Sequence, residues 1–137
     1  MSSAGKPQEE AAAPVAPVAA ATVLYVCADR GTVIPSLAAD RAEEEGRAFA
    51  QRHGLLITEV VADEFGEPDP ARRKGWRRVR ELAAAGAVAS VLVRWPAAIA
   101  PESASEHRHH ETSWLQKRGV RVRYTWEPLA KRDGDTR

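Results

Sequence analysis

The chain has 137 residues, of which 44% are hydrophobic and 28% are charged, as in an ordinary globular protein, so we expect one folded domain. Its 20 Lys and Arg residues against 19 Asp and Glu residues leave a formal net charge of +1, which excludes the overall basicity of a dedicated nucleic-acid-binding protein. A single cysteine, Cys27, excludes an intramolecular disulfide and a multi-cysteine zinc site, and fits a reducing cytoplasm, where we expect the protein to reside.

The N-terminal segment resembles the apolar part of a signal peptide. Two glutamates stand where such a peptide has positive charge, and two prolines interrupt any helix there, so we expect no signal peptide. We predict instead a mobile Ala/Pro tail over residues 1–21, a domain over residues 22–128 and a polar tail over residues 129–137. Since no run approaches the roughly 18 apolar residues of a membrane span, no membrane contact is expected.

The first half of the chain predicts two strands around a helix. Residues 23–27 are β-branched and aromatic and indicate a buried strand that ends in a turn. A helix is expected from Pro35-Ser36 to about His53, ended by Gly54. A second strand at residues 55–61 then precedes an acidic, proline-rich loop at residues 63–70.

The second half is organised around the apolar run at residues 88–93. Such a run without polar alternation indicates a central strand covered on both faces. A helix is expected before it, over residues 72–85. The capping-box spacing of Ser103-Ala104-Ser105-Glu106 predicts another helix after it, to about Arg118. A last strand, with one wet face, is expected over residues 120–126.

Strands that alternate with helices predict an α/β fold. We expect a three-layer α/β/α domain with a mostly parallel four-stranded sheet, in the order 2-1-3-4. On this order a functional crevice lies between strands one and three, bounded by residues 27–32 and 94–101. The second of these segments is nearly devoid of polar side chains.

Short stretches in a fixed order carry a family resemblance from Leu24 to Val122. They are Leu24-Tyr25, Ser36-Leu37-Ala38-Ala39-Asp40-Arg41, Arg47-Ala48-Phe49-Ala50, His53-Gly54, Asp63-Glu64, the Arg73-to-Leu82 helix, the valine-rich strand and Arg118-Gly119-Val120-Arg121-Val122. In order and spacing they resemble the catalytic domain of the serine recombinases, the resolvase and invertase family. The resemblance implies a resolvase-like fold and a relation to DNA recombination.

The residues that the resemblance assigns to catalysis are mostly replaced. The Tyr-x-Arg-Val-Ser pattern of the family becomes Tyr25-Val26-Cys27-Ala28-Asp29, which puts Asp29 at the position of the serine nucleophile and Cys27 at that of an arginine. The aspartate and both arginines of its Lys-Leu-Asp-Arg-Leu-x-Arg cluster become Ala97, Ala98 and Pro101, so that only Arg73 survives. Phosphoryl transfer needs cations around the developing charge, so we expect a catalytically inactive pseudoenzyme.

Other polar clusters offer further hypotheses. One predicted helix carries six basic residues that could bind DNA phosphates: Arg72, Arg73, Lys74, Arg77, Arg78 and Arg80. A solvated helix face is the simpler interpretation. His107, His110 and Glu111 have helical spacing that could hold a metal, but no supporting motif accompanies them, so we expect no metal or other cofactor. Glu43-Glu44-Glu45 is most simply a solvated helix face.

Three functional hypotheses remain open at this point. The first is an inactive binding or regulatory module, the second a DNA-contacting accessory factor that uses the basic helix, and the third a weak phosphoryl-transfer enzyme that uses Asp29 or Cys27. For the first hypothesis we expect the apolar segment Ala97-Ala98-Ile99-Ala100 to form a surface crevice that a protein partner or a second copy of the chain covers.

Overall fold

The computed structural model describes residues 20–28, residue 34 and residues 36–126. Its strands are β2 (Ala20–Ala28), β3 (Leu55–Glu64), β4 (Ser90–Val93) and β5 (Arg121–Tyr124). Its α-helices are α1 (Leu37–Arg52), α2 (Lys74–Ala84) and α3 (Ser105–Lys117). Short 3-10 turns lie at Pro70–Arg72, Pro96–Ala98 and Glu102–Ala104.

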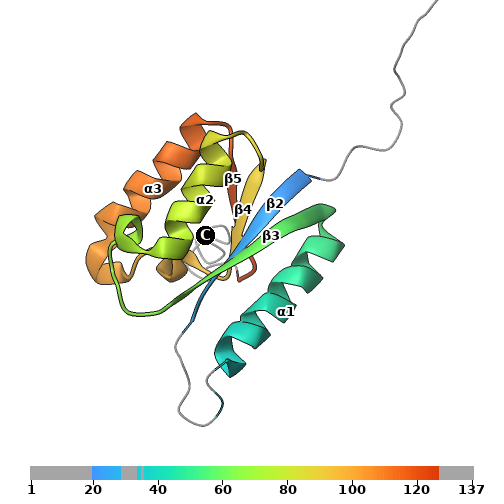
Figure 1. Ribbon diagram of the computed structural model, residues 1–137, viewed down its shortest axis with the longest axis horizontal. Coiled ribbons are helices and arrows are strands. Elements are labelled where there is room, and N and C mark those ends of the chain that lie inside the picture. Colours follow the sequence, from blue (N-terminus) through green and yellow to red (C-terminus); the bar gives the residue numbers. More distant parts are fainter. Residues whose placement is uncertain (1–19, 29–33, 35, 127–137) are drawn as a thin grey trace, which may run out of the picture.

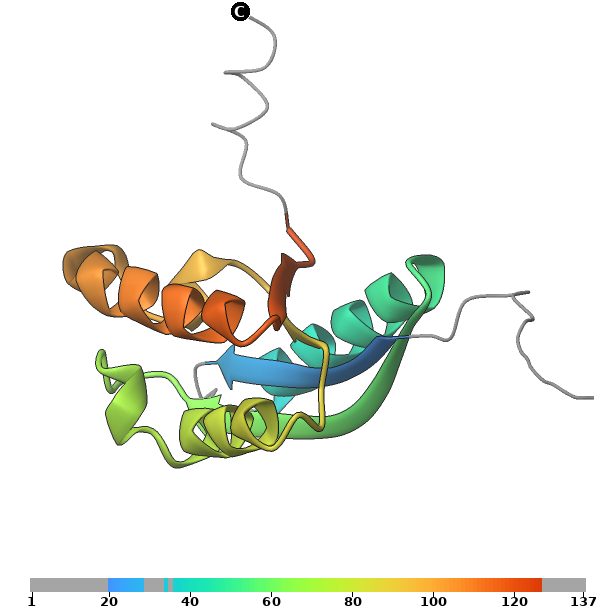
Figure 2. The same cartoon turned by 90° about the horizontal axis from the view of Figure 1, so that it is seen from above.

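The four strands form one parallel sheet in the order β3-β2-β4-β5 (Figure 1). Helix α1 covers one face, and α2 and α3 cover the other (Figures 1 and 2). This arrangement confirms the predicted three-layer α/β fold with sheet order 2-1-3-4. It also brings the carboxyl ends of β2 and β4 side by side.

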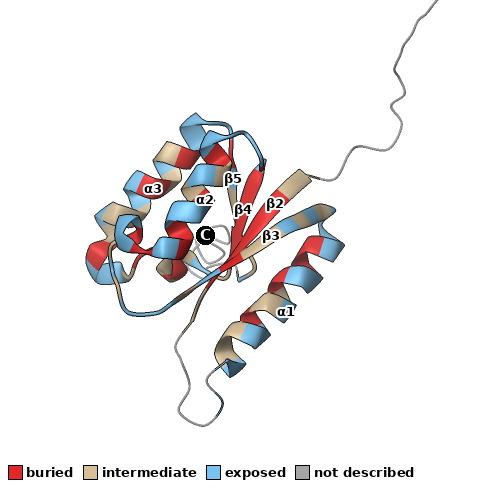
Figure 3. Cartoon of the chain, in the orientation of Figure 1, coloured by how far each residue is buried: buried red, intermediate tan, exposed pale blue. Residues whose placement is uncertain are grey.

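Alternating residues of the two central strands pack into two separate hydrophobic cores, one on each face of the sheet. On β2, Val23 and Tyr25 pack towards α2 and α3, whereas Leu24 and Val26 pack towards α1. Burial of both sets explains why these strands are mostly apolar. Figure 3 shows the middle of the sheet as buried. A Cβ on Gly46 would lie 2.5 Å from Leu24 Cδ1, so the glycine inside α1 permits its close approach to β2.

Several predicted boundaries were wrong. Strand β2 begins at Ala20, so residues 20 and 21 belong to the sheet and not to the predicted tail. The rest of that tail and the predicted turn at residues 29–31 lie outside the described residues. Strand β3 continues to Glu64, into the predicted loop, because its last residues pair with the end of β2. The expected capping box is not formed either. Helix α3 begins at Ser105 after a 3-10 turn, and no side-chain hydrogen bond caps it.

Gly54 was predicted correctly as the residue that ends the first helix, and Gly86 has the same place after α2. Gly54 and Gly86 have φ of 68° and 71°, the left-handed conformation in which glycine is favoured after a helix. Among the described residues, no helix is long and apolar enough to cross a membrane.

Candidate functional site

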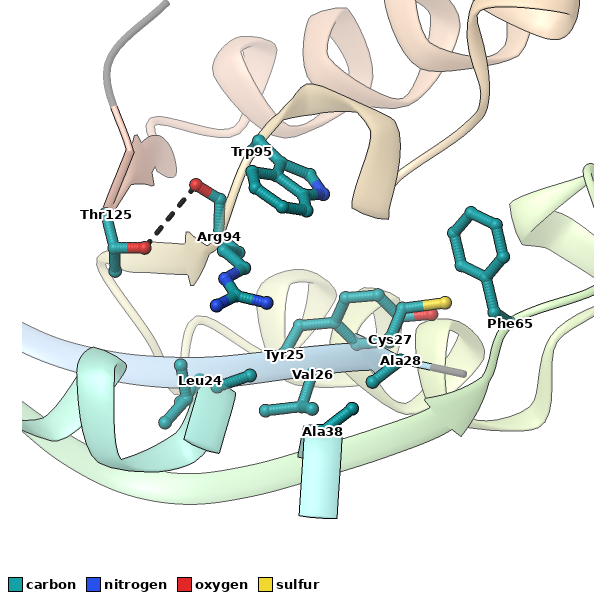
Figure 4. Close-up of a pocket in the computed structure, with 11 residues that line it drawn as sticks. Leu24, Tyr25, Val26, Cys27, Ala28, Ala38, Phe65, Arg94, Trp95 and Thr125 are labelled. Carbon is teal, nitrogen blue, oxygen red and sulfur yellow. Dashed lines mark hydrogen bonds between the residues drawn. The ribbon is translucent and has the colours of Figure 1, made fainter. Parts of the chain in front are cut away.

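A crevice lies at the carboxyl ends of β2 and β4, where the strand order predicted it (Figure 4). Its volume is about 200 Å³. Cys27 and Ala28 line it from β2, and Arg94 and Trp95 line it from the segment after β4. Residues 29–32, the remainder of the predicted first boundary, lie outside the described residues.

The walls of the crevice are mostly apolar. Side chains from four segments contribute to them: Leu24, Val26, Ala38, Ala42, Phe65 and Trp95. In Figure 4 the rings of Phe65 and Trp95 stand on two sides of the opening, above the end of β2. Such a surface favours an apolar ligand over a phosphate.

Arg94 is the charged side chain in the lining, and it is already paired. Its Nε and Nη2 atoms donate to the two carboxylate oxygens of Glu45 on α1, at 2.9 and 2.8 Å. Trp126 Nε1 also donates to this carboxylate, at 3.1 Å. Burial raises the pKa of Glu45, but the hydrogen bonds from Arg94 and Trp126 and the charge of Arg94 outweigh it, so the pKa lies below its ordinary value. Glu45, which the sequence placed on a solvated helix face, is half-buried and is the counter-ion of Arg94.

Arg73, the arginine that the resemblance retains, is buried within the fold with 4% of its surface exposed. Its Nε donates to the carbonyl oxygen of Glu67 at 2.7 Å. Its Nη1 donates to the carbonyl oxygen of Ala98 at 2.8 Å and to the Tyr25 hydroxyl at 3.2 Å. The guanidinium thus joins three segments of the chain through its Nε and Nη1 atoms.

Tyr25 and Asp63 extend this network to the start of α2. The Tyr25 hydroxyl donates to Asp63 Oδ2 at 2.7 Å. Burial is the main cause that raises the pKa of Tyr25, so this hydroxyl stays protonated and can act as donor. The backbone N–H groups of Gly75 and Trp76 donate to the same carboxylate at 2.8 and 2.9 Å. Asp63 therefore satisfies free N–H groups of the first turn of α2.

The prediction that residues 97–100 form a surface crevice was wrong. Ala98, Ile99 and Ala100 have 1%, 0% and 0% of their surface exposed, and Ala98 and Ile99 belong to the core under α2 and α3. The 3-10 turn at Pro96–Ala98 folds the chain back onto the sheet, which buries these small apolar side chains. The exposed apolar residue of this region is Trp95, which precedes the turn.

The three weak metal-ligand candidates, His107, His110 and Glu111, each have a different environment in the structure. Glu111 is buried and accepts a 2.8 Å hydrogen bond from Trp76 Nε1, while Arg80 lies 3.6 Å from it. His110 is exposed to solvent, and His107 lies 3.9 Å from Asp69. Within the described part of the chain, no three His, Cys, Asp or Glu residues are placed to hold one metal ion.

Most cations of the basic helix are paired within the chain. Arg78 bonds Glu59 at 2.7 Å and Glu81 at 3.3 Å, and the Arg80 guanidinium lies 4.4 Å from the centre of the Trp114 ring. Arg72 lies 3.9 Å from Glu67, and Arg73 is buried, as described above. The remaining two, Lys74 and Arg77, are exposed and form no ion pair with any residue that the structure describes.

No protein-family model matches the sequence, and no curated protein matches it. Solved structures do match. The C-terminal catalytic domain of ISC1926 TnpA, an IS607-like serine recombinase, gives a TM-score of 0.67 at 16% identity over 77% of this chain and 70% of that chain. A serine recombinase from Sulfolobus solfataricus gives a TM-score of 0.53 at 14% identity over 79% and 71%. The N-terminal catalytic domain of TP901-1 integrase gives a TM-score of 0.63 at 13% sequence identity, over 77% of this chain and 76% of that chain.

The chain has the fold of a serine recombinase catalytic domain. The predicted resemblance is thereby confirmed at the level of fold. Within this recombinase-like domain, Cys27 is half-buried and lines the crevice, whereas Asp29, at the nucleophile position, lies outside the described residues.

Sequence reasoning missed the partners that the recombinase-like fold gives to its polar residues. Tyr25 and Asp63 both stand near strand ends, and this placement was the available signal that they meet at one edge of the sheet. Glu45 and Glu111 gave no such signal, because helical spacing alone does not show which residue of another element a carboxylate faces.

Proposed function

We propose that this recombinase-like domain does not transfer phosphoryl groups and works as a binding or regulatory module. The observation that supports the proposal best is the position of Arg73. Its guanidinium is buried, and its Nε and Nη1 atoms donate to Glu67, Ala98 and Tyr25, so these donors serve the fold and not a bound phosphate.

The charge of the crevice supports the same conclusion. Arg94 is neutralised by Glu45, and the positions of the missing arginines carry Ala98, which is buried, and Pro101. Attack on a phosphodiester builds negative charge that preorganised cations must stabilise. An aspartate or thiolate nucleophile would meet that charge without them. The alternative of a weak phosphoryl-transfer enzyme using Asp29 or Cys27 is therefore disfavoured.

A test of this proposal is a search for a covalent protein–DNA adduct. The full chain is incubated with supercoiled plasmid and with linear duplex DNA, and denaturing gels are stained for nicked DNA and for protein shifted by attached DNA. We expect neither product. A DNA-shifted protein band that disappears in Asp29→Asn or in Cys27→Ser would refute the proposal and identify the nucleophile.

A second candidate function, as a DNA-contacting accessory factor, is favoured by Lys74 and Arg77, the exposed cations of α2 that have no ion-pair partner among the described residues. If these side chains bind phosphates, Arg77→Ala should flatten the slope of log affinity against log salt by about 0.9 on duplex DNA. Arg78→Ala is the matched control, because Arg78 is already paired with Glu59 and should change the slope less. Equal slopes for Arg77→Ala and the unmodified chain would place any DNA contact elsewhere.

A further inference from the structure

The crevice at the carboxyl ends of β2 and β4 has the size of a small ligand. Its volume is about 200 Å³, and an apolar cavity of about 150 Å³ can hold a benzene ring. It also lies between the two strands at which the sheet order changes direction, the place where open α/β sheets bind small ligands. One six-membered ring with a short substituent therefore fits the space.

The walls offer the contacts that an aromatic ring prefers. Phe65 and Trp95, which are 44% and 40% exposed, stand on two sides of the opening (Figure 4). The side chains of Leu24, Val26 and Ala38 line the hollow below them. A flat ring in this position would cover apolar surface on both aromatic side chains and gain edge or offset stacking with them.

The charges around the crevice exclude a cationic ligand. Aromatic side chains attract cations to the faces of their rings. Here the Arg94 guanidinium already occupies that position, with its Cζ atom 4.8 Å from the centre of the Trp95 ring and 5.6 Å from that of the Trp126 ring. A second cation would be repelled by the first.

The same arginine gives no net charge to attract an anion. Its Nε and Nη2 atoms bond both carboxylate oxygens of Glu45, so the pair is neutral, and a bound anion would lose hydration without gaining a counter-ion. Nη1 of Arg94 forms no hydrogen bond with any residue that the structure describes. It can therefore donate to one uncharged oxygen of a ligand.

From the volume, the apolar walls and the neutral ion pair we propose that the crevice binds a small neutral aromatic compound, a single ring with one hydrogen-bonding oxygen. The ring lies between Phe65 and Trp95, and the oxygen accepts from Arg94. This proposal rests on the proposed function, since it gives the binding module a class of ligand.

The first test compares three probes that share one ring and differ in charge. Benzyl alcohol, benzoate and benzylamine, which is protonated at neutral pH, are titrated into the full chain by calorimetry. Benzyl alcohol should bind at one site with millimolar affinity, which is ordinary for a ligand of this size. Benzoate and benzylamine should each bind about tenfold more weakly or not at all, because their charges find no partner in the crevice.

The second test fills the crevice. Ala38→Leu on α1 and Ala28→Leu at the end of β2 each put a larger side chain into the lining, and both should weaken benzyl alcohol binding about tenfold or more. Ala84→Leu is the matched control. Ala84 is exposed on α2, on the other side of the sheet, so this variant should bind as the unmodified chain does.

Thermal unfolding shows which variants are folded, and two filling variants on different elements keep the test valid if one is not. The proposal would be overturned by the absence of saturable benzyl alcohol binding, by equal binding of benzoate or benzylamine, or by binding that both filling variants leave unchanged. None of these results concerns cleavage. A covalent DNA adduct would instead refute the proposed function, so the two failures are distinguishable.

Discussion

Arg73 shows at the scale of a single residue how a buried cation can hold several segments of a fold together. A catalytic arginine faces its substrate, and its removal leaves the fold largely intact. Here the guanidinium is buried and donates to Glu67, Ala98 and Tyr25. Its removal would leave buried acceptors without donors, which costs stability.

We therefore predict that Arg73→Ala lowers the free energy of unfolding by about 3 kcal/mol. Urea denaturation followed by circular dichroism measures this change. Arg77→Ala on the same helix is the control and should change stability by less than about 0.5 kcal/mol, because an exposed side chain is removed. Equal stability of Arg73→Ala and the unmodified chain would show that these bonds do not support the fold.

Ala98 gives a second prediction at this scale. Its side chain is 1% exposed and lies in the core, so Ala98→Arg would bury an unpaired charge in a packed site. We expect a loss of about 3 to 5 kcal/mol in the free energy of unfolding, or failure to fold. Ala97→Arg, at the half-buried neighbouring position, should be tolerated much better in the same denaturation experiment.

The start of α2 depends, at the scale of the element, on a glycine and an aspartate. The Asp63 carboxylate accepts bonds from the N–H groups of Gly75 and Trp76, and a Cβ on Gly75 would lie 2.7 Å from Asp63 Oδ2. The helix can approach the end of β3 closely because position 75 has no side chain. This contact also orients Tyr25, which donates to the same carboxylate.

Gly75→Ala should lower the free energy of unfolding by about 1 to 3 kcal/mol, since the new methyl group must push the carboxylate away. Chemical denaturation measures it. The matched experiment is a double-mutant cycle with Asp63→Ala. If the clash is the cause, the double variant should lose clearly less than the sum of the two single losses. Additive losses would indicate a different cause.

At the scale of the whole molecule, an ion pair joins α1 to the segment after β4. Glu45 and Arg94 are far apart in sequence, and together with Trp126 they connect three elements at the crevice. Because the pKa of Glu45 is lowered in the folded chain, the ionised carboxylate stabilises the fold above its ordinary pKa. This contribution is lost as the pH falls through the lowered value.

We predict that Arg94→Met lowers the free energy of unfolding by about 1 kcal/mol near pH 7, a modest figure because the pair is partly exposed. The difference from the unmodified chain should shrink as the pH falls below about 4, where the unfolded carboxyl becomes protonated. Thermal unfolding over a pH series measures both. Arg47→Met, which breaks the more exposed Arg47–Glu43 pair within α1, is the control and should have a smaller effect at neutral pH. A difference independent of pH would exclude the ion pair as its origin.

The sequence by itself determined the elements, the layers and the strand order. Uninterrupted apolar runs such as residues 88–93 are stable only between two covered faces, and helices between them impose parallel strands and a crevice at their carboxyl ends. The replacement of the catalytic residues that the resemblance assigns remains a prediction from residue identity alone.

Only the tertiary structure decided which polar groups are free and which apolar groups are covered. Arg73, Glu45 and Glu111 meet partners on other elements, at separations that no local pattern encodes. Ala98 and Ile99 stand between two prolines in a segment that we predicted to lie at the surface. The 3-10 turn at Pro96–Ala98 instead folds them into the core. Local sequence fixes backbone propensity and periodicity, whereas charge pairing and burial depend on which elements pack together.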